Sequence, residues 1–215
     1  MLNKKKVIIF VAILIIIVAL IIFLIIGGDS GSKVANMYKK LTETNEYTFE
    51  MKNNNGYDIS IAKKGEKTSI DLNNETGRVT TLVKDNLTYV ISHSQKEYRV
   101  YNADMAGETV ITDMLGDLKE EKATKGKEII NGKEYKYEEY DNFAGFMTAT
   151  NEDVDENKTK TRLYFEGNNL VYIKTIPENG EEELLEVKVS YIAPDELFEI
   201  PSDYAERGNQ KINEE

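Results

Sequence analysis

The sequence holds few residues of the kinds that carry out catalysis. It has no cysteine and a single histidine, His93, which stands in Ile91-Ser92-His93-Ser94 at the end of an expected strand. Thiol chemistry, disulfides and zinc sites built on thiolates are excluded, and a Ser-His-Asp triad would have to use His93 itself. No Gly-x-Ser-x-Gly elbow and no glycine-rich phosphate loop occurs. Although 38 acidic residues leave a carboxylate pair open, we predict that the chain is not an enzyme and uses no cofactor.

One acidic stretch is spaced like a metal-binding loop. Asp153-x-Asp155-x-Asn157 matches the first three ligands of a calcium loop. The glycine that such a loop needs is replaced by Lys158, and the twelfth position is Tyr164 instead of a glutamate. We therefore predict a solvated loop tip and no metal site, with these three residues as the weak candidate ligands.

The N-terminal residues indicate where in the cell the protein is located. Positions 7–26 are twenty apolar residues without charge, glycine or proline, and a helix of that length spans roughly 30 Å, the hydrocarbon thickness of a bilayer. Three lysines precede the run, so the positive-inside rule places the N-terminus in the cytoplasm. We predict a cytoplasmic tail at 1–6, a transmembrane anchor at 7–26 and a linker at 27–32. The alternative is a cleaved signal peptide, although its apolar core is normally shorter, roughly 7–15 residues.

The charge of the chain excludes some partners. The formal net charge is −11, and without the three N-terminal lysines it is −14. A domain this acidic is not expected to bind nucleic acid or anionic lipid, because both bind basic surfaces. An extracytoplasmic domain of this size without disulfides is typical of bacteria. We therefore expect a single-pass protein of the plasma membrane, with its C-terminal domain in the cell envelope and no nucleic-acid partner.

After the linker the hydrophobic pattern changes from helical to extended. Apolar residues at helical spacing predict a helix from an N-cap at Ser32 through about Thr44. From Tyr47 onward apolar and polar residues alternate over about ten or eleven short strands, with Asn-Gly turns among their connections. Segments 103–121 and 142–160 interrupt the alternation. The first is predicted to contain an internal helix, because its apolar residues have helical spacing: Val110, Ile111, Met114, Leu115 and Leu118. No βαβ unit is found, so the pattern favours a curved antiparallel sheet with one face covered by helices.

The end of the chain resembles a known family. Leu197-Phe198-x-Ile200-Pro201-x-x-Tyr204 follows the last strand. This tail, with the N-terminal helix and the long meander, is similar to the periplasmic lipoprotein-carrier family and its Gram-positive relatives. The resemblance implies a mainly β (α+β) fold, a curved antiparallel sheet that forms an incomplete β-barrel around one to three helices. It covers residues 33–204, after which 205–215 are expected to be a disordered tail. The predicted fold class is therefore this incomplete β-barrel, preceded by a single N-terminal transmembrane helix.

The resemblance also implies a function. Members of the family hold acyl chains or lipidated proteins in an apolar cavity, so we expect a membrane-anchored binding module for a lipid or a lipidated protein. The alternative is a solid-core interaction domain with a protein partner in the envelope. An apolar stripe on strands also describes ordinary core, and Phe143 to Met147 reads equally as a mobile lid or as a buried loop. The candidate ligand-binding residues are Tyr47, Phe49, Ile59, Ile61, Leu87, Tyr89, Phe143, Phe146, Met147, Leu163 and Phe165.

Overall fold

The chain divides into residues 1–32 and a compact unit, residues 33–215. The computed structural model describes residues 31–53, 56, 58–102, 111–143, 155 and 158–208. Within these ranges no helix is long and apolar enough to cross a membrane. The predicted anchor at 7–26 and most of the predicted tail at 205–215 lie outside the described residues.

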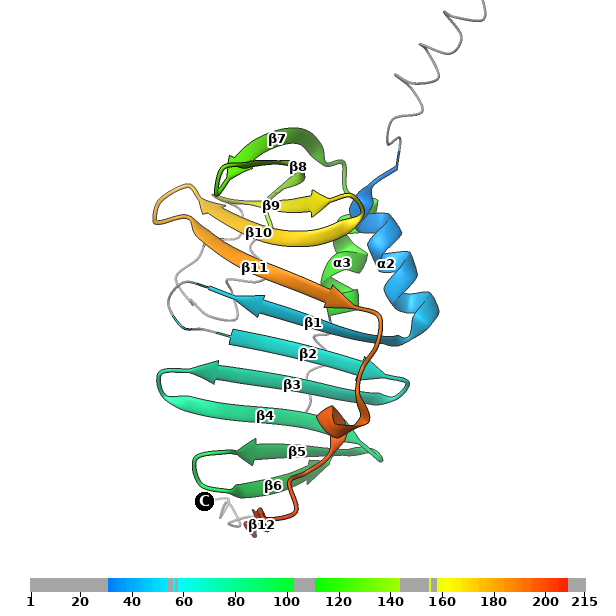
Figure 1. The fold of residues 1–215 in the computed structure, drawn as a ribbon, viewed down its shortest axis with the longest axis vertical. Coiled ribbons are helices and arrows are strands. Elements are labelled where there is room, and N and C mark those ends of the chain that lie inside the picture. Colours follow the sequence, from blue (N-terminus) through cyan, green and yellow to red (C-terminus); the bar gives the residue numbers. More distant parts are fainter. Residues whose placement is uncertain are drawn as a thin grey trace, which may run out of the picture. The chain divides into compact units, whose positions relative to one another are not determined.

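Two antiparallel meanders join into one twelve-stranded sheet (Figure 1). The first meander runs from β1 to β6 and the second from β7 to β11, and they meet where β1 pairs with β11. A two-residue strand, β12, pairs in parallel with β6 at one end of the sheet. The strands are β1 Glu46–Lys52, β2 Asp58–Lys64, β3 Lys67–Asn74, β4 Gly77–Lys84, β5 Leu87–Ser92, β6 Glu97–Asn102, β7 Thr124–Ile130, β8 Lys133–Asp141, β9 Thr159–Glu166, β10 Asn169–Pro177, β11 Glu183–Ser190 and β12 Ala205–Glu206.

Other parts of the chain pack against both faces of this sheet. The helices α2 (Lys33–Thr44) and α3 (Ile111–Glu120) lie behind the sheet in Figure 1, and the segment that contains the short helix η3 (Asp195–Phe198) crosses in front of it. Side chains alternate between faces along a strand. We call the side of Phe49 and Ile61, which share a core cluster with both helices, the helix face, and the opposite side the strap face.

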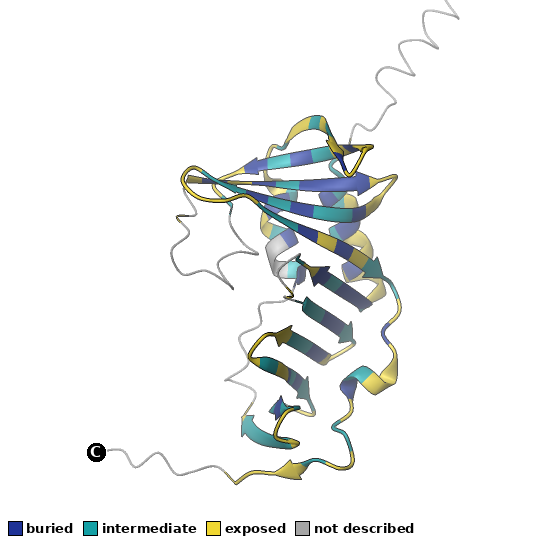
Figure 2. Ribbon diagram, turned by 60° about the vertical axis from the view of Figure 1, so that its left-hand side comes forward, coloured by how far each residue is buried: buried dark blue, intermediate teal, exposed yellow. Residues whose placement is uncertain are grey.

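The structure bears out one part of the predicted fold class and corrects another. The protein is mainly β and its sheet is open, as predicted, because β7 and β12 end the strand order and do not pair with each other. Figure 2 shows the strands as an extended array beside the helices. The two helices have 12 and 10 residues, and they cover the middle of one face while the η3 segment covers part of the other. The helices therefore pack on one face of the open sheet. The correction concerns the transmembrane helix of the predicted class, because none of the described helices is long and apolar enough to cross a membrane.

Local sequence explains the first helix and the turns. The predicted helix from 33 to 44 is confirmed as α2, and its buried residues Val34, Met37 and Leu41 have helical spacing. Asn131 and Gly132 both have positive φ (51° and 80°), as a tight two-residue hairpin turn requires, and they join β7 to β8. The predicted internal helix is confirmed from Ile111 onward, whereas 103–110 lie outside the described residues.

A charged network ties β7 to β9 and β10 on the strap face. Glu128 accepts hydrogen bonds from Arg162 Nη1 (2.7 Å), the Tyr164 hydroxyl (2.6 Å) and Lys174 Nζ (3.0 Å). Burial by itself raises the pKa of Glu128, but the hydrogen bonds from Tyr164, Lys174 and Arg162 outweigh it and lower the pKa from 4.5 to about 2.

This pKa shift predicts how stability depends on pH. Because the folded state lowers the pKa of Glu128, its contribution is present above about pH 4.5 and is lost as the pH falls toward 2. In urea denaturation, Glu128→Gln should be less stable than wild type at pH 6, and the gap should narrow steadily between pH 4.5 and pH 2. Glu134→Gln, at the exposed ion pair with Lys127, is the control. A gap of constant size over this range would contradict the assignment.

Candidate functional site

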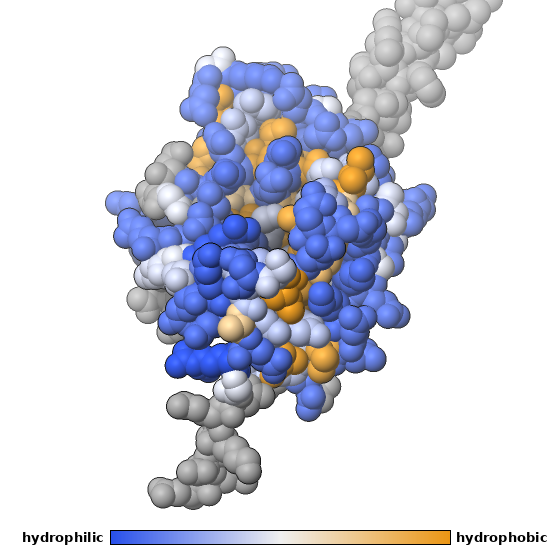
Figure 3. Space-filling model, turned by 60° about the horizontal axis from the view of Figure 1, so that its bottom comes forward, coloured by the Kyte–Doolittle hydropathy of each residue, from blue (hydrophilic) through white to orange (hydrophobic). Residues whose placement is uncertain are grey.

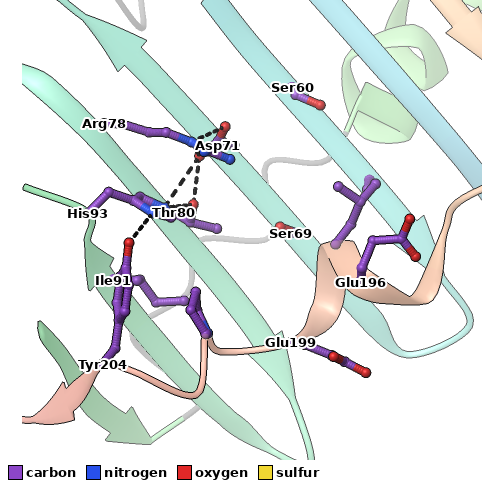
Figure 4. Close-up of a pocket in the computed structure, with 13 residues that line it drawn as sticks. Ser60, Ser69, Asp71, Arg78, Thr80, Ile91, His93, Glu196, Glu199 and Tyr204 are labelled. Atoms are coloured by element: carbon purple, nitrogen blue, oxygen red, sulfur yellow. Dashed lines mark hydrogen bonds and ion pairs between the residues drawn. The ribbon is translucent and has the colours of Figure 1, made fainter. Parts of the chain in front are cut away.

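A pocket of about 290 Å³ lies on the strap face, between the sheet and the segment that follows β11. Ser60 and Ser69 line it from β2 and β3, and Thr80 and Ile91 from β4 and β5. Glu196 of η3 and Tyr204 line it from the segment after β11, and in Figure 4 Tyr204 lies beside His93 while Glu196 lies on the other side of Ser69. The register supports a common face, because Ser60 pairs with Asp71 and Asp71 pairs with Thr80.

A chain of hydrogen bonds forms one wall of this pocket (Figure 4). The Thr80 hydroxyl donates to Asp71 Oδ1 (2.6 Å) and also contacts His93 Nε2 (2.7 Å). Since its proton is directed to the carboxylate, His93 must donate from Nε2, and Nδ1 then accepts from the Tyr204 hydroxyl (3.0 Å). Arg78 Nε donates to both oxygens of Asp71 (3.0 and 2.9 Å). Each side chain of the wall, from Tyr204 to Arg78, is thus bonded to the next one.

This wall favours a neutral histidine. Burial lowers the pKa of His93, and the charge of Arg78 lowers it further, while Asp71 acts in the opposite direction. Neutral His93 has one donor and one acceptor nitrogen, which is what Thr80 and Tyr204 require. His93 therefore contacts a threonine and a tyrosine through its two ring nitrogens.

The segment after β11 is held firmly to the sheet. Phe198 is buried in a cluster with Ala62, Leu82 and Ile91, and the same cluster includes Leu197, Ile200 and Tyr204 as partly buried members. Lys64 contacts Asp195 (2.9 Å) and Lys96 contacts Asp203 (2.7 Å). The apolar residues of the Leu-Phe-x-Ile-Pro-x-x-Tyr tail thus pack onto the strap face, and the tail forms one side of the pocket. Sequence reasoning missed this site, although the small residues Ser60, Ala62 and Ser69 on neighbouring strands were a signal for it.

A second pocket continues along the same sheet. It has about 240 Å³ and shares Ser60, Asp71 and Arg78 with the first. Glu50 and Lys52 of β1 also line it. The Arg78–Asp71 pair therefore stands between two polar depressions.

The sequence-predicted apolar residues do not form one site. Tyr47, Phe49, Ile61, Leu163 and Phe165 are buried in the core cluster of the helix face, with Ile59 and Phe143 partly buried against it. Tyr89 packs in the cluster of the strap face. Leu87 pairs with Lys84, whose amine reaches the Phe198 carbonyl, so Leu87 also belongs to the strap face. Phe146 and Met147 lie outside the described residues.

The candidate calcium loop is described at one of its three positions. Asp155 contacts Lys158 through its carboxylate (3.7 Å), and its backbone carbonyl accepts from Lys158 N (3.0 Å) and Thr159 Oγ1 (2.7 Å). Asp153 and Asn157 lie outside the described residues. Over the described part of the chain, no group of three or more His, Asp or Glu side chains could hold a metal ion.

Comparisons with known proteins give no family. No family model matches the chain, and no curated protein matches it. Among solved structures, an uncharacterized conserved protein from Thermus thermophilus aligns over 82% of this chain and 99% of its own, with 6% identity and a TM-score of 0.46. The lipoprotein LppX from Mycobacterium tuberculosis aligns over 73% and 93%, with 9% identity and a TM-score of 0.38. The family resemblance expected from the tail therefore stays a prediction.

Proposed function

We propose that this chain is a binding module that holds an apolar ligand, such as a lipid acyl chain, against the helix face of β3 to β5. The observation that carries the proposal is an apolar strip that continues from the helix-covered core onto these strands. Its members beyond the core are Ile70 and Leu72 of β3, Val79 and Val83 of β4, and Val90 of β5.

The register places these side chains on one face. Ile61 pairs with Ile70, which pairs with Thr81 and, through it, with Val90. A parallel row leads from Ile59 to Leu72 and Val79. Residues directly opposite in an antiparallel pair point to the same side, with Cβ atoms about 4.5–5.5 Å apart. The strip is therefore a continuation of the core surface.

Burial falls along this strip. Ile61 is 7% exposed within the core, and Val79 is 39% exposed. Ile70, Leu72, Val83 and Val90 are partly buried. Burying an acyl chain on such a surface gains about 0.8 kcal/mol for each methylene removed from water. The side chains of the strip carry no charge, so recognition here depends on apolar area.

A second candidate function is the solid-core interaction domain, and the edge of the sheet favours it. β7 is the last strand in the sheet order, so its outer edge has no partner strand among the described residues. Ile129 on this strand is 70% exposed. An open strand edge is a template for an added strand from another protein.

Native mass spectrometry of residues 33–215 with bacterial membrane lipids tests the proposal. We expect an added lipid mass for wild type and its loss in Val79→Lys, which places a charge in the strip. Ile129→Lys, an exposed apolar residue at the distant edge strand, is the matched control and should keep the lipid. A lipid-free mass for wild type under these conditions would remove the proposal and leave the interaction domain.

The remaining predictions are not tested by these observations. That the chain is not an enzyme stays a prediction. Its place outside the cytoplasm at the plasma membrane also stays a prediction, because it rests on residues 1–32.

A further inference from the structure

We propose that the pocket between η3 and the strap face binds a primary ammonium group, carried by a small amine or by a lysine side chain of a protein. This site lies on the side of the sheet opposite the apolar strip. The inference is therefore independent of lipid binding.

The first observation that indicates a ligand is the position of the Ser69 side chain. Its side chain lines the pocket and the residue is only 5% exposed, between its strand neighbours Ala62 and Leu82. None of the described residues forms a hydrogen bond with its hydroxyl. The Ser69 oxygen is not one of the fully enclosed polar atoms, so it is reached through the pocket. A hydroxyl of a buried residue that is open to a pocket is suited to a ligand.

The charge around the pocket selects the class of ligand. Three carboxylates, those of the partly buried Asp71 and of the exposed residues Glu196 and Glu199, line the pocket with one guanidinium, that of Arg78. With His93 neutral the lining has a net charge of −2. Asp71 is already bonded to Arg78 and Thr80, whereas Glu196 and Glu199 form no ion pair with any described residue. A cation is therefore favoured over an anion.

The available acceptors match an ammonium group. It carries three N–H donors and no acceptor. Ser60 and Ser69 offer hydroxyl oxygens from the sheet, and Glu196 offers a carboxylate from the η3 side, across Ser69 from the wall of hydrogen bonds (Figure 4). A volume of about 290 Å³ suits a small ligand or a single side chain. The wall from Tyr204 to Arg78 holds its own geometry, so the pocket is formed before binding.

The surface at the β6 end of the sheet is largely polar. In Figure 3, which brings the β6 end of the molecule forward, polar surface predominates and the hydrophobic atoms form small separate groups. The whole chain carries −11, so cations are attracted to its surface at long range as well.

NMR titration of residues 33–215, which contain the whole sheet and both helices, tests the inference. The probes are Nα-acetyl-lysine amide, pentylamine and the uncharged Nα-acetyl-norleucine amide. Both amines should shift the backbone amide signals of Ser60, Ser69 and Thr80, and the norleucine compound should not. Tighter binding of pentylamine indicates a free amine as the natural ligand, and tighter binding of the lysine compound indicates a protein side chain. Equal shifts with the norleucine compound, or no shift with any probe, would overturn the inference.

Two variants locate the site. Ser69→Ala and Glu196→Gln should each weaken amine binding about tenfold or more, as expected for the loss of a hydrogen bond to a charged group. Glu66→Gln, an exposed change in the β2–β3 turn, is the control and should bind like wild type. If Ser69 is kept for a ligand, Ser69→Ala should have an unchanged or higher melting temperature. A clear fall in melting temperature with unchanged amine binding would assign Ser69 to the fold instead.

Discussion

Replacing Glu138 with alanine is expected to lower the free energy of unfolding by about 2–4 kcal/mol, because several buried donors lose their acceptor at once. Glu138 lies on β8 and is 2% exposed. One carboxylate oxygen accepts from the backbone N–H of Lys33 (2.7 Å), and the other accepts from Val34 N (3.2 Å) and the Tyr140 hydroxyl (3.1 Å). The carboxylate therefore closes the N-terminus of α2 from a distant strand.

The helix dipole adds to this effect. The first N–H groups of a helix have no partner within it and carry partial positive charge, which a carboxylate complements. Lys125 Nζ stands 3.6 Å from the same carboxylate and supplies a second positive charge. Since α2 contributes Val34, Met37 and Leu41 to the core, releasing its first turn loosens the cover of the whole helix face.

Urea denaturation and amide hydrogen exchange measure the two consequences. Glu138→Ala should shift the denaturation midpoint and speed exchange most in the first half of α2. Glu138→Gln should lose less, because one side-chain oxygen remains as an acceptor. Glu134→Ala, on the same strand at an exposed ion pair, should change stability by no more than about 1 kcal/mol. Equal losses in Glu138→Ala and Glu134→Ala would show that Glu138 does not hold the helix.

The same contact shows what local pattern predicts and what it misses. The spacing of Val34, Met37 and Leu41 gave the bounds of α2 correctly, because a helix depends on near neighbours. Ser32 was the expected cap, whereas the acceptor that the structure shows at this end of α2 is Glu138, which lies 105 positions after Lys33. Nothing near Ser32 in the sequence indicates a carboxylate that arrives from β8.

The faces of the sheet show a second limit. Alternation predicted the strands, and Phe49 and Ile61 face the helices as expected. Leu87 and Tyr89 were grouped with them, yet their register places them on the strap face with Leu82 and Lys84. Period two identifies an apolar side of a strand but does not identify which face of the sheet that side meets. Here both faces bear apolar clusters, because the tail covers the second one.

The order of the strands in the sheet was beyond the sequence pattern for a related reason. Alternation identifies the strands of a meander but does not identify which of them lie at the ends of the sheet. Here β1 pairs with β11 in the middle of the sheet, which leaves β7 and β12 at opposite ends. That pairing joins Thr48 to Ser190, residues too far apart in sequence for local spacing to relate.

Truncating Phe49 is the other change with a large expected effect. Phe49 is fully buried on β1, in the cluster that contains residues of both helices. Removing a large core side chain leaves a cavity, and Phe49→Ala should lower the free energy of unfolding by about 3–5 kcal/mol. Phe49→Leu keeps most of the volume and should lose about 1 kcal/mol. Thermal denaturation of both variants measures how the loss of stability depends on the side-chain volume removed.

The difference in stability between the two variants distinguishes a solid core from a ligand cavity around Phe49, where the sequence was compatible with both. Phe143, which lies partly buried at the edge of the same cluster, is the matched control, and Phe143→Ala should lose clearly less stability than Phe49→Ala. If Phe49 lined an open cavity, Phe49→Ala would alter lipid binding. The lipid-free variant would then be nearly as stable as the lipid-free wild type. A large loss of stability in the lipid-free protein, with lipid binding still sensitive to Val79→Lys, would place the ligand on the strip beyond the core. The buried aromatic residues of β1 and β9 would then position that strip without touching the ligand.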